Sequence, residues 1–336
     1  MRVLIKNIEK FEGKEIELMG WVETRRDHGK LIFIDFRDRT GLAQVVFADK
    51  SLHSVADSLR SEFVIKLKGE VRKRPKGMEN TKIPGGQYEI SATGLEILSE
   101  AKTPPFDVMS DGLDVNEEVR MKYRYLDLRR PRLQKNIRHR SRVINFIRSF
   151  LDNEEFTEIE TPILGKSTPE GARDYLVPAR LQPGKFYALP QAPQQYKQLM
   201  MVAGFEKYYQ IARCFRDEDT RGDRQPEFTQ LDLEMSFVKR EDVIELNEKL
   251  LIAITQKLYP EKKIQEIPFP RLSYEAAMKK YGNDHPDLRK DKNDSNLLAF
   301  CWIIDFPFFE RVKLEAKRAH PELVEGLSGS GSTSSP

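Results

Sequence analysis

The sequence predicts an α+β chain in which a small β-barrel precedes a second domain built from an antiparallel sheet with flanking helices. Short strands with alternating apolar residues fill the first hundred of the 336 residues, whereas long amphipathic helices follow beyond residue 130. In the second part, residues 208–216 and 227–234 have the pattern of two strands joined by a charged loop. The length is typical of two or three domains.

Five strands and one helix are expected in residues 1–100. A turn signal, Asp38-Arg39-Thr40-Gly41, separates the second strand from the third, and residues 51–61 have helical character. Five strands with a helix after the third is the order of an OB-fold barrel, and a generic small barrel is the alternative. The alternating segments are 15–22, 31–37, 42–47, 63–71 and 88–90.

A linker is expected at residues 101–135, because Thr103-Pro104-Pro105 interrupts regular structure. It includes a basic segment, residues 120–132, in which arginine and lysine occur together with tyrosine. Such a segment is found both at solvated helix ends and at contacts with RNA phosphates. Its composition leaves both interpretations open.

The second domain is expected at residues 136–310. Residues 133–153 and 240–258 have the apolar spacing of amphipathic helices, and residues 300–307 have the composition of a buried strand. Beyond residue 310 the chain loses this character, and its last ten residues are mostly Gly and Ser. Because such a composition cannot bury a core, residues 311–336 are expected to be an unrelated, disordered tail.

Charge and cysteine usage exclude several classes of protein. Charged residues make up 32% of the chain but nearly cancel, leaving a net charge of +3, so the total identifies no partner. Cys214 and Cys301 lie far apart, which supports neither a zinc site nor a disulfide framework. The N-terminus lacks a signal-peptide pattern, and no run approaches the roughly twenty apolar residues of a membrane span. A soluble cytoplasmic protein without membrane contact is therefore expected.

The predicted hairpin carries the strongest functional signal. Gln230, Asp232 and Glu234 recur at a spacing of two, which places all three on one face of a strand. An acidic face is unsuited to a core and suits the floor of a binding site. Arg216 ends the first strand, and a guanidinium offers a fixed fork of donors for a phosphate. Arg216-Asp217-Glu218 by itself is more typical of an exposed, salt-bridged turn.

From Tyr208 to Glu234 the chain resembles motif 2 of the class II aminoacyl-tRNA synthetases, and in detail that of the bacterial aspartyl-tRNA synthetases. The loop 167–175 and the segment 189–201 share this resemblance, and a helix–strand unit ending at Pro162 is similar to motif 1. Residues 1–100 resemble the anticodon-binding domain of the same family. The resemblance implies an OB-fold barrel, an incomplete class II catalytic sheet with motifs 1 and 2 only, and a homodimer formed through the motif 1 region.

The function implied is that of an aspartate–tRNA ligase, which activates L-aspartate with ATP and transfers it to the 3′ end of tRNA-Asp. No covalent enzyme intermediate is required, so positioning and charge stabilisation would carry catalysis. The implied catalytic residues are Arg216 and Glu218. The aspartate site would consist of Glu170, Gln194, Gln195, Lys197, Arg216 and Asp232. The ATP site would consist of Arg216, Asp217, Glu218, Gln225 and Phe228.

Residue chemistry suits three of these implied roles. Lys197 offers a point charge for a side-chain carboxylate, and binding the neutral amide of asparagine would leave that charge poorly paired. The carboxylate of Glu170 would contact the ammonium group of the amino acid. Phe228 would stack on adenine.

The resemblance also implies four anticodon-binding residues on the barrel, which are Arg26, His28, Phe33 and Gln44. Phe33 and Gln44 fall on the second and third strands, the usual ligand face of an OB-fold, where a ring can stack on a base. A place in the barrel core is the alternative for Phe33. His28 stands where family members that charge tRNA-Asp alone often carry leucine, and histidine there resembles the group that also charges tRNA-Asn. Both tRNA specificities remain open.

The resemblance covers residues 1–310 and omits part of the family pattern. The sequence contains neither motif 3 nor the arginine that pairs with the aspartate side chain, and it lacks the bacterial insertion domain. Mg²⁺ is expected from the family, although its main acidic ligands are not found. One explanation is a fragment with impaired activity and an unrelated tail. A non-catalytic RNA-binding relative is the second, and an asparaginyl or lysyl ligase is the third.

Overall fold

The computed structural model describes residues 2–81, 83, 85–168 and 170–309, so the tail expected at 311–336 lies outside the described residues. The chain divides into two compact units, residues 1–138 and 139–336. The boundary falls within the helix α4 (Pro131–Asn153), close to the end of the expected linker. In the described part of the chain, no helix has both the length and the apolar character that crossing a membrane requires.

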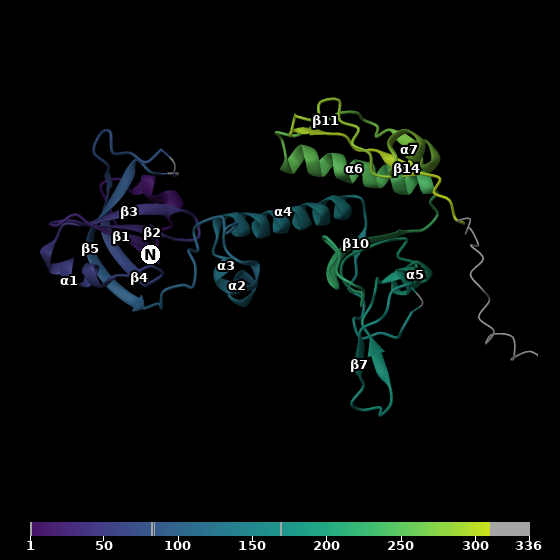
Figure 1. The fold of residues 1–336 in the computed structure, drawn as a ribbon, viewed down its shortest axis with the longest axis horizontal. Helices are drawn as coiled ribbons and strands as arrows, with labels where there is room; N and C mark the ends of the chain where they lie inside the picture. Colours follow the sequence, from purple (N-terminus) through teal and green to yellow (C-terminus); the bar gives the residue numbers. More distant parts are fainter. Residues whose placement is uncertain (1, 82, 84, 169, 310–336) are drawn as a thin grey trace, which may run out of the picture. The chain divides into compact units, whose positions relative to one another are not determined.

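The first unit contains a closed five-stranded barrel with the strand order β1-β2-β3-β5-β4 (Figure 1). The helix α1 (Lys50–Ser58) follows β3, so the predicted OB-fold order is confirmed. The side chain of Asp49 caps this helix by accepting a hydrogen bond from the backbone N–H of Ser51. The strands are β1 (Glu15–Asp27), β2 (Ile32–Arg37), β3 (Leu42–Phe47), β4 (Val64–Lys73) and β5 (Tyr88–Ser99).

The barrel closes because β1 is long enough to pair with two partners. Its first half lies antiparallel to β4 and its second half lies antiparallel to β2, with a bulge between Val22 and Thr24. Gly20 permits this closure, since a β-carbon there would lie 2.1 Å from the carbonyl oxygen of Arg37. The short helix η1 (Ile5–Phe11) adds two buried isoleucines to the core, and Asp38 accepts a hydrogen bond from the backbone N–H of Ile5 at 2.9 Å.

Alternation along β2 decides the position of Phe33. Ile32, Ile34 and Phe36 are fully buried in the barrel core, whereas the residues between them are partly exposed. Phe33 is one of these partly exposed residues, so it lies on the outer surface of the barrel. The alternative that placed Phe33 in the core is therefore wrong.

The linker region of the first unit is held by a buried carboxylate. It contains the helices α2 (Glu117–Lys122) and α3 (Arg124–Asp127). Asp127 is fully buried and forms ion pairs with Arg120, Arg124 and Arg130, the last at 2.7 Å. Three arginines of the basic segment therefore neutralise a buried charge. For these three positions, this favours a role in the fold over contact with RNA phosphates.

A second ion cluster attaches this region to the barrel. The buried side chain of Glu62 accepts two hydrogen bonds from Arg37, at 2.9 and 3.0 Å, and is also paired with Arg129. The guanidinium groups of Arg37 and Arg129 lie 5.9 and 5.6 Å from the ring centroid of Trp21. The region between the barrel and α4 is thus an ordered part of the first unit.

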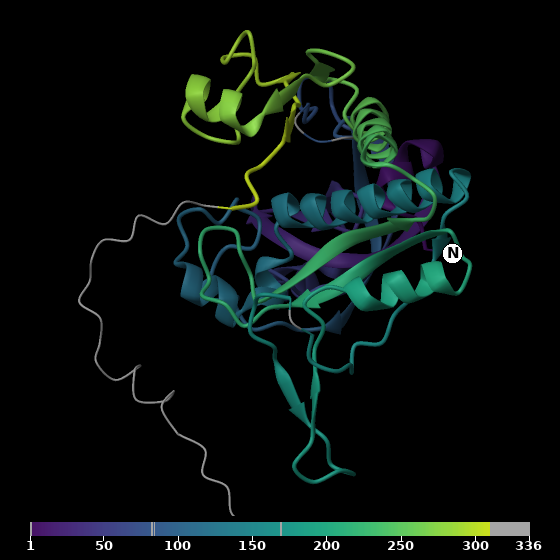
Figure 2. The same cartoon turned by 90° about the vertical axis from the view of Figure 1, so that its right-hand side faces the viewer.

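The second unit is built on a three-stranded sheet with the order β10-β9-β6. The strands β9 (Lys207–Phe215) and β10 (Glu227–Met235) form the predicted antiparallel hairpin. The strand β6 (Thr157–Glu158) lies parallel to β9, so the sheet is not wholly antiparallel. One sheet face packs against α4 and α6 (Arg240–Leu258) through a core that includes Leu151, Phe156, Tyr209 and Leu246, and Figure 2 shows both helices on this side.

Two predicted strands are shorter than expected. The segment 156–164 is a strand only at β6, because Pro162 has no N–H to donate to a neighbouring strand. The segment 300–307 is a strand only at β14 (Trp302–Ile304), where the three residues are half-buried, and Phe306 is 54% exposed. The prediction of a long buried strand there is wrong, because among the described residues β14 pairs only with the parallel strand β12 (Arg271–Ser273).

The remaining elements described in the second unit are short strands and two helices. The strands β7 (Leu176–Pro178) and β8 (Phe186–Ala188) form a second hairpin that projects from the sheet in Figures 1 and 2. The helix α5 (Gln194–Val202) lies against β9 and β10. The strands β11 (Lys263–Ile264) and β13 (Leu297–Leu298) pair in parallel, and α7 (Tyr274–Tyr281) follows β12.

Candidate active site and nucleic-acid face

The register of the β9–β10 hairpin gathers polar residues on one sheet face. Asp232 lies opposite Gln210, and Glu234 lies opposite Tyr208. Because side chains alternate between the two faces, Gln230, Asp232 and Glu234 share the face that does not contact α4 and α6. The predicted acidic face is therefore present, and the apolar residues between these positions explain it, since Leu231 and Leu233 pack into the core on the other side.

Lys197 reaches this acidic face from α5. Its ammonium nitrogen lies 3.2 Å from Oδ1 of Asp232 and 3.5 Å from Oε2 of Glu234. The lysine side chain is only 13% exposed, so solvent screens these contacts less than on an open surface. The other carboxylate oxygen of Asp232 is buried and has no hydrogen-bond partner within the described residues. The arrangement offers both a cation and an unpaired acceptor to a ligand.

The first turn of α5 places the two predicted glutamines differently. Gln194 is half-buried and precedes Lys197 by three residues, which puts both on the same side of the helix. Gln195 is exposed and precedes Lys197 by two residues, about 200° away around the helix. The structure brings Gln194 to the side of the acidic face and leaves Gln195 in solvent, and the aspartate-binding role of each stays a prediction.

The loop 167–174 is held beside the site by a residue that sequence reasoning missed. Gln191 is 1% exposed, and its amide exchanges hydrogen bonds with the backbone N–H and C=O of Ala172, at 3.0 and 2.8 Å. Glu170 accepts a hydrogen bond from the hydroxyl of Thr168 at 3.0 Å. The sequence offered one signal for Gln191, which is its position between two prolines. A buried side-chain amide in such a loop can form the hydrogen bonds that the loop backbone needs.

A cavity of about 390 Å³ opens where the hairpin strands meet their connecting loop. The guanidinium of Arg216 lies 5.0 Å from the ring centroid of Phe228, so the arginine covers one face of the aromatic ring. This cavity brings together four of the five residues predicted to bind ATP. Its lining residues are Arg216, Glu218, Asp219, Asp223, Arg224, Gln225 and Phe228.

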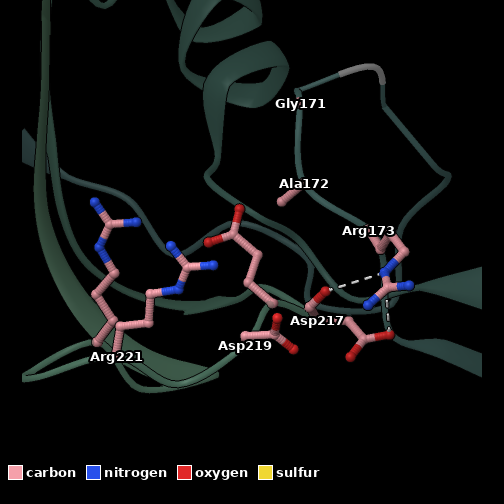
Figure 3. A pocket seen from close by; sticks show the side chains of 8 residues that line it. Gly171, Ala172, Arg173, Asp217, Asp219 and Arg221 are labelled. Atoms are coloured by element: carbon pink, nitrogen blue, oxygen red, sulfur yellow. Dashed lines mark hydrogen bonds and ion pairs between the residues drawn. The ribbon is translucent and has the colours of Figure 1, made fainter.

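A neighbouring cavity of about 370 Å³ lies between the loop 167–174 and the hairpin loop (Figure 3). Asp217, the fifth predicted ATP residue, lines it and is engaged by Arg173. The backbone N–H of Asp217 donates to the carbonyl of Arg173 at 3.0 Å, and Nε of Arg173 donates to the carbonyl of Asp217 at 3.3 Å. Glu218 lines both cavities. Arg173, Arg221 and Arg224 face three carboxylates in this lining, so the cavity offers charges of both signs.

The buried groups below the cavities are held in their neutral forms. Burial raises the pKa of the Cys214 thiol to about 11, and the negative charge of Asp232 adds to this effect. Burial and the same carboxylate raise the pKa of Tyr208 above its ordinary value. Cys214 is thus a protonated thiol at neutral pH and is unsuited to act as a nucleophile.

The barrel presents the four predicted anticodon residues on its outer surface. Arg26 lies opposite Phe33, and its guanidinium donates to Asp35 at 2.8 Å. The ring of His28 meets Phe33 edge-on, with 5.4 Å between the centroids. Gln44 donates to Glu89 at 3.0 Å.

Two carboxylates on this face were not predicted. Asp35 and Glu89 lie opposite Gln44 on the neighbouring strands β2 and β5. Asp35 also accepts a hydrogen bond from the hydroxyl of Thr24 at 2.6 Å. The spacing of two from Phe33 to Asp35 could have revealed the first of them, whereas the place of Glu89 depends on the barrel order, in which β5 pairs with β3.

A protein-held metal site does not fit the residues present. Among the described residues, no three His, Cys, Asp or Glu side chains are grouped closely enough to hold a metal ion. Asp217, Glu218 and Asp219 line a cavity without forming such a group.

Comparison with known families identifies the two units. Residues 116–328 match the model of the class II tRNA synthetases (D, K and N), which is more than half of the chain. The chain belongs to this family. Residues 16–98 match the OB-fold nucleic acid binding domain of anticodon-binding type, in agreement with the observed barrel. The class II synthetases are enzymes, and their model includes the site on β9 and β10 described above.

Curated relatives of this synthetase family are identical to the chain at more than half of the aligned positions. The aspartate–tRNA(Asp/Asn) ligase of Syntrophomonas wolfei is 57% identical over 281 residues, which are 82% of this chain and 47% of the relative. The ligase of the same name from Moorella thermoacetica is 56% identical over 294 residues, covering 86% of this chain and 48% of its own length. The chain thus spans about half the length of the curated relatives it matches.

Solved structures of class II synthetases have the same fold. The asparaginyl-tRNA synthetase of Pyrococcus horikoshii superposes with a TM-score of 0.72 at 24% identity, over 85% of this chain and 68% of that one. The aspartyl-tRNA synthetase of Entamoeba histolytica gives a TM-score of 0.69 at 22% identity, over 83% of this chain and 62% of its own. At these identities the likeness concerns the fold alone.

Proposed function

We propose that this chain carries the amino-acid activation site and the anticodon-binding barrel of an aspartate–tRNA ligase. The observation that supports this proposal best is the placement of Lys197 over the acidic face of the hairpin, 3.2 Å from Asp232. A buried lysine beside an unpaired carboxylate oxygen suits a ligand with one carboxylate and one ammonium group. The names of the curated relatives, which share more than half of their aligned residues with the chain, support the same substrate.

The proposed reaction begins when the α-carboxylate oxygen of L-aspartate attacks the α-phosphorus of ATP. The bond from that phosphorus to the bridging oxygen breaks, and pyrophosphate leaves with the electron pair. Arg216 neutralises charge on the phosphate, and Phe228 stacks on adenine once the guanidinium moves from its ring. Glu218, Asp217 and Gln225 hold the nucleotide at the rims of the two cavities. The 3′-terminal ribose hydroxyl of the tRNA then attacks the carbonyl carbon of the aspartyl-adenylate, the bond from that carbon to the phosphate oxygen breaks, and AMP leaves.

Aspartate is recognised by charge in this proposal. Lys197 pairs with the side-chain carboxylate, so asparagine would leave the lysine with a weaker partner. Glu170 and Gln194 supply contacts for the ammonium and the α-carboxylate, and Asp232 orients Lys197, whereas the exposed Gln195 is left without a contact to the amino acid. An asparaginyl or lysyl ligase would need another partner for its amino acid here, because Lys197 would repel the ammonium of a lysine side chain.

We also propose that the outer face of the barrel binds the anticodon of tRNA-Asp. Phe33 stacks on one base, while Arg26 and Gln44 contact neighbouring polar groups. His28 contacts the edge of Phe33, so it adjoins the same base. The relatives named for both tRNA-Asp and tRNA-Asn support relaxed recognition of the two tRNAs.

The proposed assembly is a homodimer formed through the motif 1 region. Ile163 and Leu164 follow Pro162 and are 45% and 55% exposed, so they offer an apolar surface beside β6. Mg²⁺ is expected to arrive with ATP, since the described residues form no site for it. We propose that adenylate formation by this chain alone is impaired, because motif 3 is not found in the sequence and the chain spans about half of its relatives.

Aspartate-dependent exchange of pyrophosphate into ATP tests the proposal, together with direct titration of L-aspartate. Wild-type chain is compared with Arg216→Ala, which removes the phosphate contact, and with Lys197→Met, which removes the cation. Binding of L-aspartate that Lys197→Met abolishes, with asparagine bound at least about tenfold more weakly, would support the site. Exchange as fast as in a complete ligase would contradict impairment. An absence of L-aspartate binding would refute the activation site.

A non-catalytic RNA-binding protein is the second candidate, and the complete barrel favours it. All five strands close, and the four predicted base-contacting residues lie together on the outside. Titration of labelled tRNA-Asp distinguishes the two candidates. Binding of tRNA without binding of L-aspartate would favour the RNA-binding protein, whereas binding of both would favour the ligase.

A further inference from the structure

Gln210 is a buried polar residue that the proposed mechanism does not use. It is 9% exposed and lies on β9, the central strand of the sheet. Its side-chain oxygen accepts two hydrogen bonds, one from the hydroxyl of Tyr208 at 2.6 Å and one from the hydroxyl of Thr161 at 2.9 Å. Thr161 lies in the segment that follows β6, so this amide connects the motif 1 segment to the floor of the site.

The two hydroxyl groups fix the orientation of the amide. The pKa of Tyr208 is raised by burial and by the charge of Asp232, so its hydroxyl keeps a proton to donate. Both donors meet one atom of the Gln210 side chain, and only the amide oxygen can accept them. The amide nitrogen must therefore point away from Tyr208 and Thr161.

Gln210 lies beside the charged groups that hold Lys197. Asp232 is its partner across the strand pair, so the two side chains emerge on the same face as near neighbours. Asp232 in turn contacts Lys197 at 3.2 Å, and Glu234 stands one pair further along, opposite Tyr208. The face therefore holds one cation and two carboxylates around an uncharged amide.

We propose that Gln210 is a positioning residue for amino-acid recognition. It anchors the floor of the site to Thr161, and as an amide it keeps the position beside the Lys197–Asp232 pair uncharged. This inference rests on the proposed function, since recognition of an anionic amino acid requires that Lys197 is not fully neutralised. A third carboxylate on this face would compete with the ligand for the lysine. An amide accepts the same two hydrogen bonds without adding charge.

Gln210→Glu separates the anchoring role from the role of charge. A glutamate accepts hydrogen bonds from Tyr208 and Thr161 as glutamine does, so thermal unfolding should be close to that of the wild type. At pH 8 the added carboxylate should weaken binding of L-aspartate at least about tenfold, as expected for a like charge at contact distance in a partly buried site.

Tyr208→Phe and Tyr209→Phe are a matched pair for the anchor itself. Both remove a hydroxyl from adjacent residues of β9, but Tyr209 donates to Asp152 and Glu158 on the opposite face. We expect Tyr208→Phe to weaken L-aspartate binding about fivefold, the effect of one lost hydrogen bond, and Tyr209→Phe to stay within about twofold. Equal effects of the two variants would overturn the anchoring role.

A signal from Lys197 itself makes the test independent of ligand binding. Reductive methylation with ¹³C-formaldehyde labels the lysines, and the Lys197 resonance is the one lost in Lys197→Arg. Gln210→Glu should shift the Lys197 resonance, because it adds a negative charge beside the ammonium group, whereas Tyr209→Phe should leave the resonance unchanged. If wild-type chain binds no L-aspartate but Lys197 responds in this way, the proposed function fails, whereas the effect of the charge at residue 210 on Lys197 stands. An unchanged Lys197 resonance in Gln210→Glu would overturn the inference.

Discussion

Asp127→Asn should destabilise the barrel unit more than any exposed substitution in its linker region. Asp127 is fully buried and receives ion pairs from Arg120, Arg124 and Arg130. Arg130 is also fully buried, and one of its terminal nitrogens already has no hydrogen-bond partner within the described residues. Asparagine keeps the shape of the side chain but removes the charge that compensates this buried guanidinium.

The magnitude follows from the cost of a buried charge without its partner. Removing one member of a buried ion pair costs about 3–5 kcal/mol, and the retained amide oxygen places this variant near the lower limit, at about 3 kcal/mol. With a urea m-value of about 2 kcal/mol per molar for a unit of this size, the unfolding midpoint should fall by about 1.5 M. Glu118→Gln is the control, since this exposed carboxylate on α2 should contribute less than about 0.5 kcal/mol.

Trp21 fluorescence in a Trp302→Phe background is the assay. Trp21 lies in the barrel unit against the guanidinium groups of Arg37 and Arg129, whereas Trp302 lies in the other unit. Urea unfolding of the barrel unit can thus be followed without the second transition. A difference below about 0.5 kcal/mol between Asp127→Asn and Glu118→Gln would refute the reasoning.

The difference in unfolding free energy between wild type and Asp127→Asn should change with pH in a defined direction. Burial alone would raise the pKa of Asp127, but hydrogen bonds from Arg120 and Arg130 outweigh it and hold the pKa below its ordinary value of 3.8. A depressed pKa means that the stabilisation is fully present above the unfolded value and is lost as the pH falls through the folded value. The difference between wild type and Asp127→Asn should stay constant from pH 8 to pH 5 and shrink below about pH 4.

Three further predictions concern the fold and the proposed sites. Gly20→Ala should destabilise the barrel by at least about 2 kcal/mol in urea unfolding, because its β-carbon would meet the carbonyl of Arg37, whereas Gly94→Ala, with only ordinary contacts to Lys68, should cost little. Phe33→Ala should weaken binding of labelled tRNA-Asp about tenfold, because base stacking is lost. An unchanged affinity would show that Phe33 is not in the interface. Phe186→Ala, which removes an exposed ring on β8, is the control. Cys214 is buried and has a pKa of about 11, so at pH 8 it should react with iodoacetamide at least about tenfold more slowly in the folded chain than after unfolding in urea. Peptide mass spectrometry measures the two rates, and equal rates would contradict the burial of this thiol.

Local patterns in the sequence determined the elements on which the proposed function depends. Alternation of apolar residues predicts the five barrel strands, and a spacing of two places Gln230, Asp232 and Glu234 on one face. These predictions hold because the period of a strand is set by its own backbone, whichever neighbour it pairs with. The prediction for residues 300–307 failed because the length and burial of a strand depend on its neighbours, and within the described part of the chain only β12 pairs with β14.

The pairing of distant residues was decided only by the tertiary structure. The spacing of three from Asp127 to Arg124 and Arg130 is visible in the sequence, but nothing there indicates that this carboxylate is buried, or that Glu62 joins Arg37 to Arg129. The basic segment could therefore equally have faced RNA. Gln210 gave no signal either, because an amide in a strand reveals its partners only when Thr161 and Tyr208 are brought to it. The sequence determined which groups are available and on which face each lies, whereas the fold determined which of them neutralise one another, because Coulomb and hydrogen-bond energies depend on distance and burial.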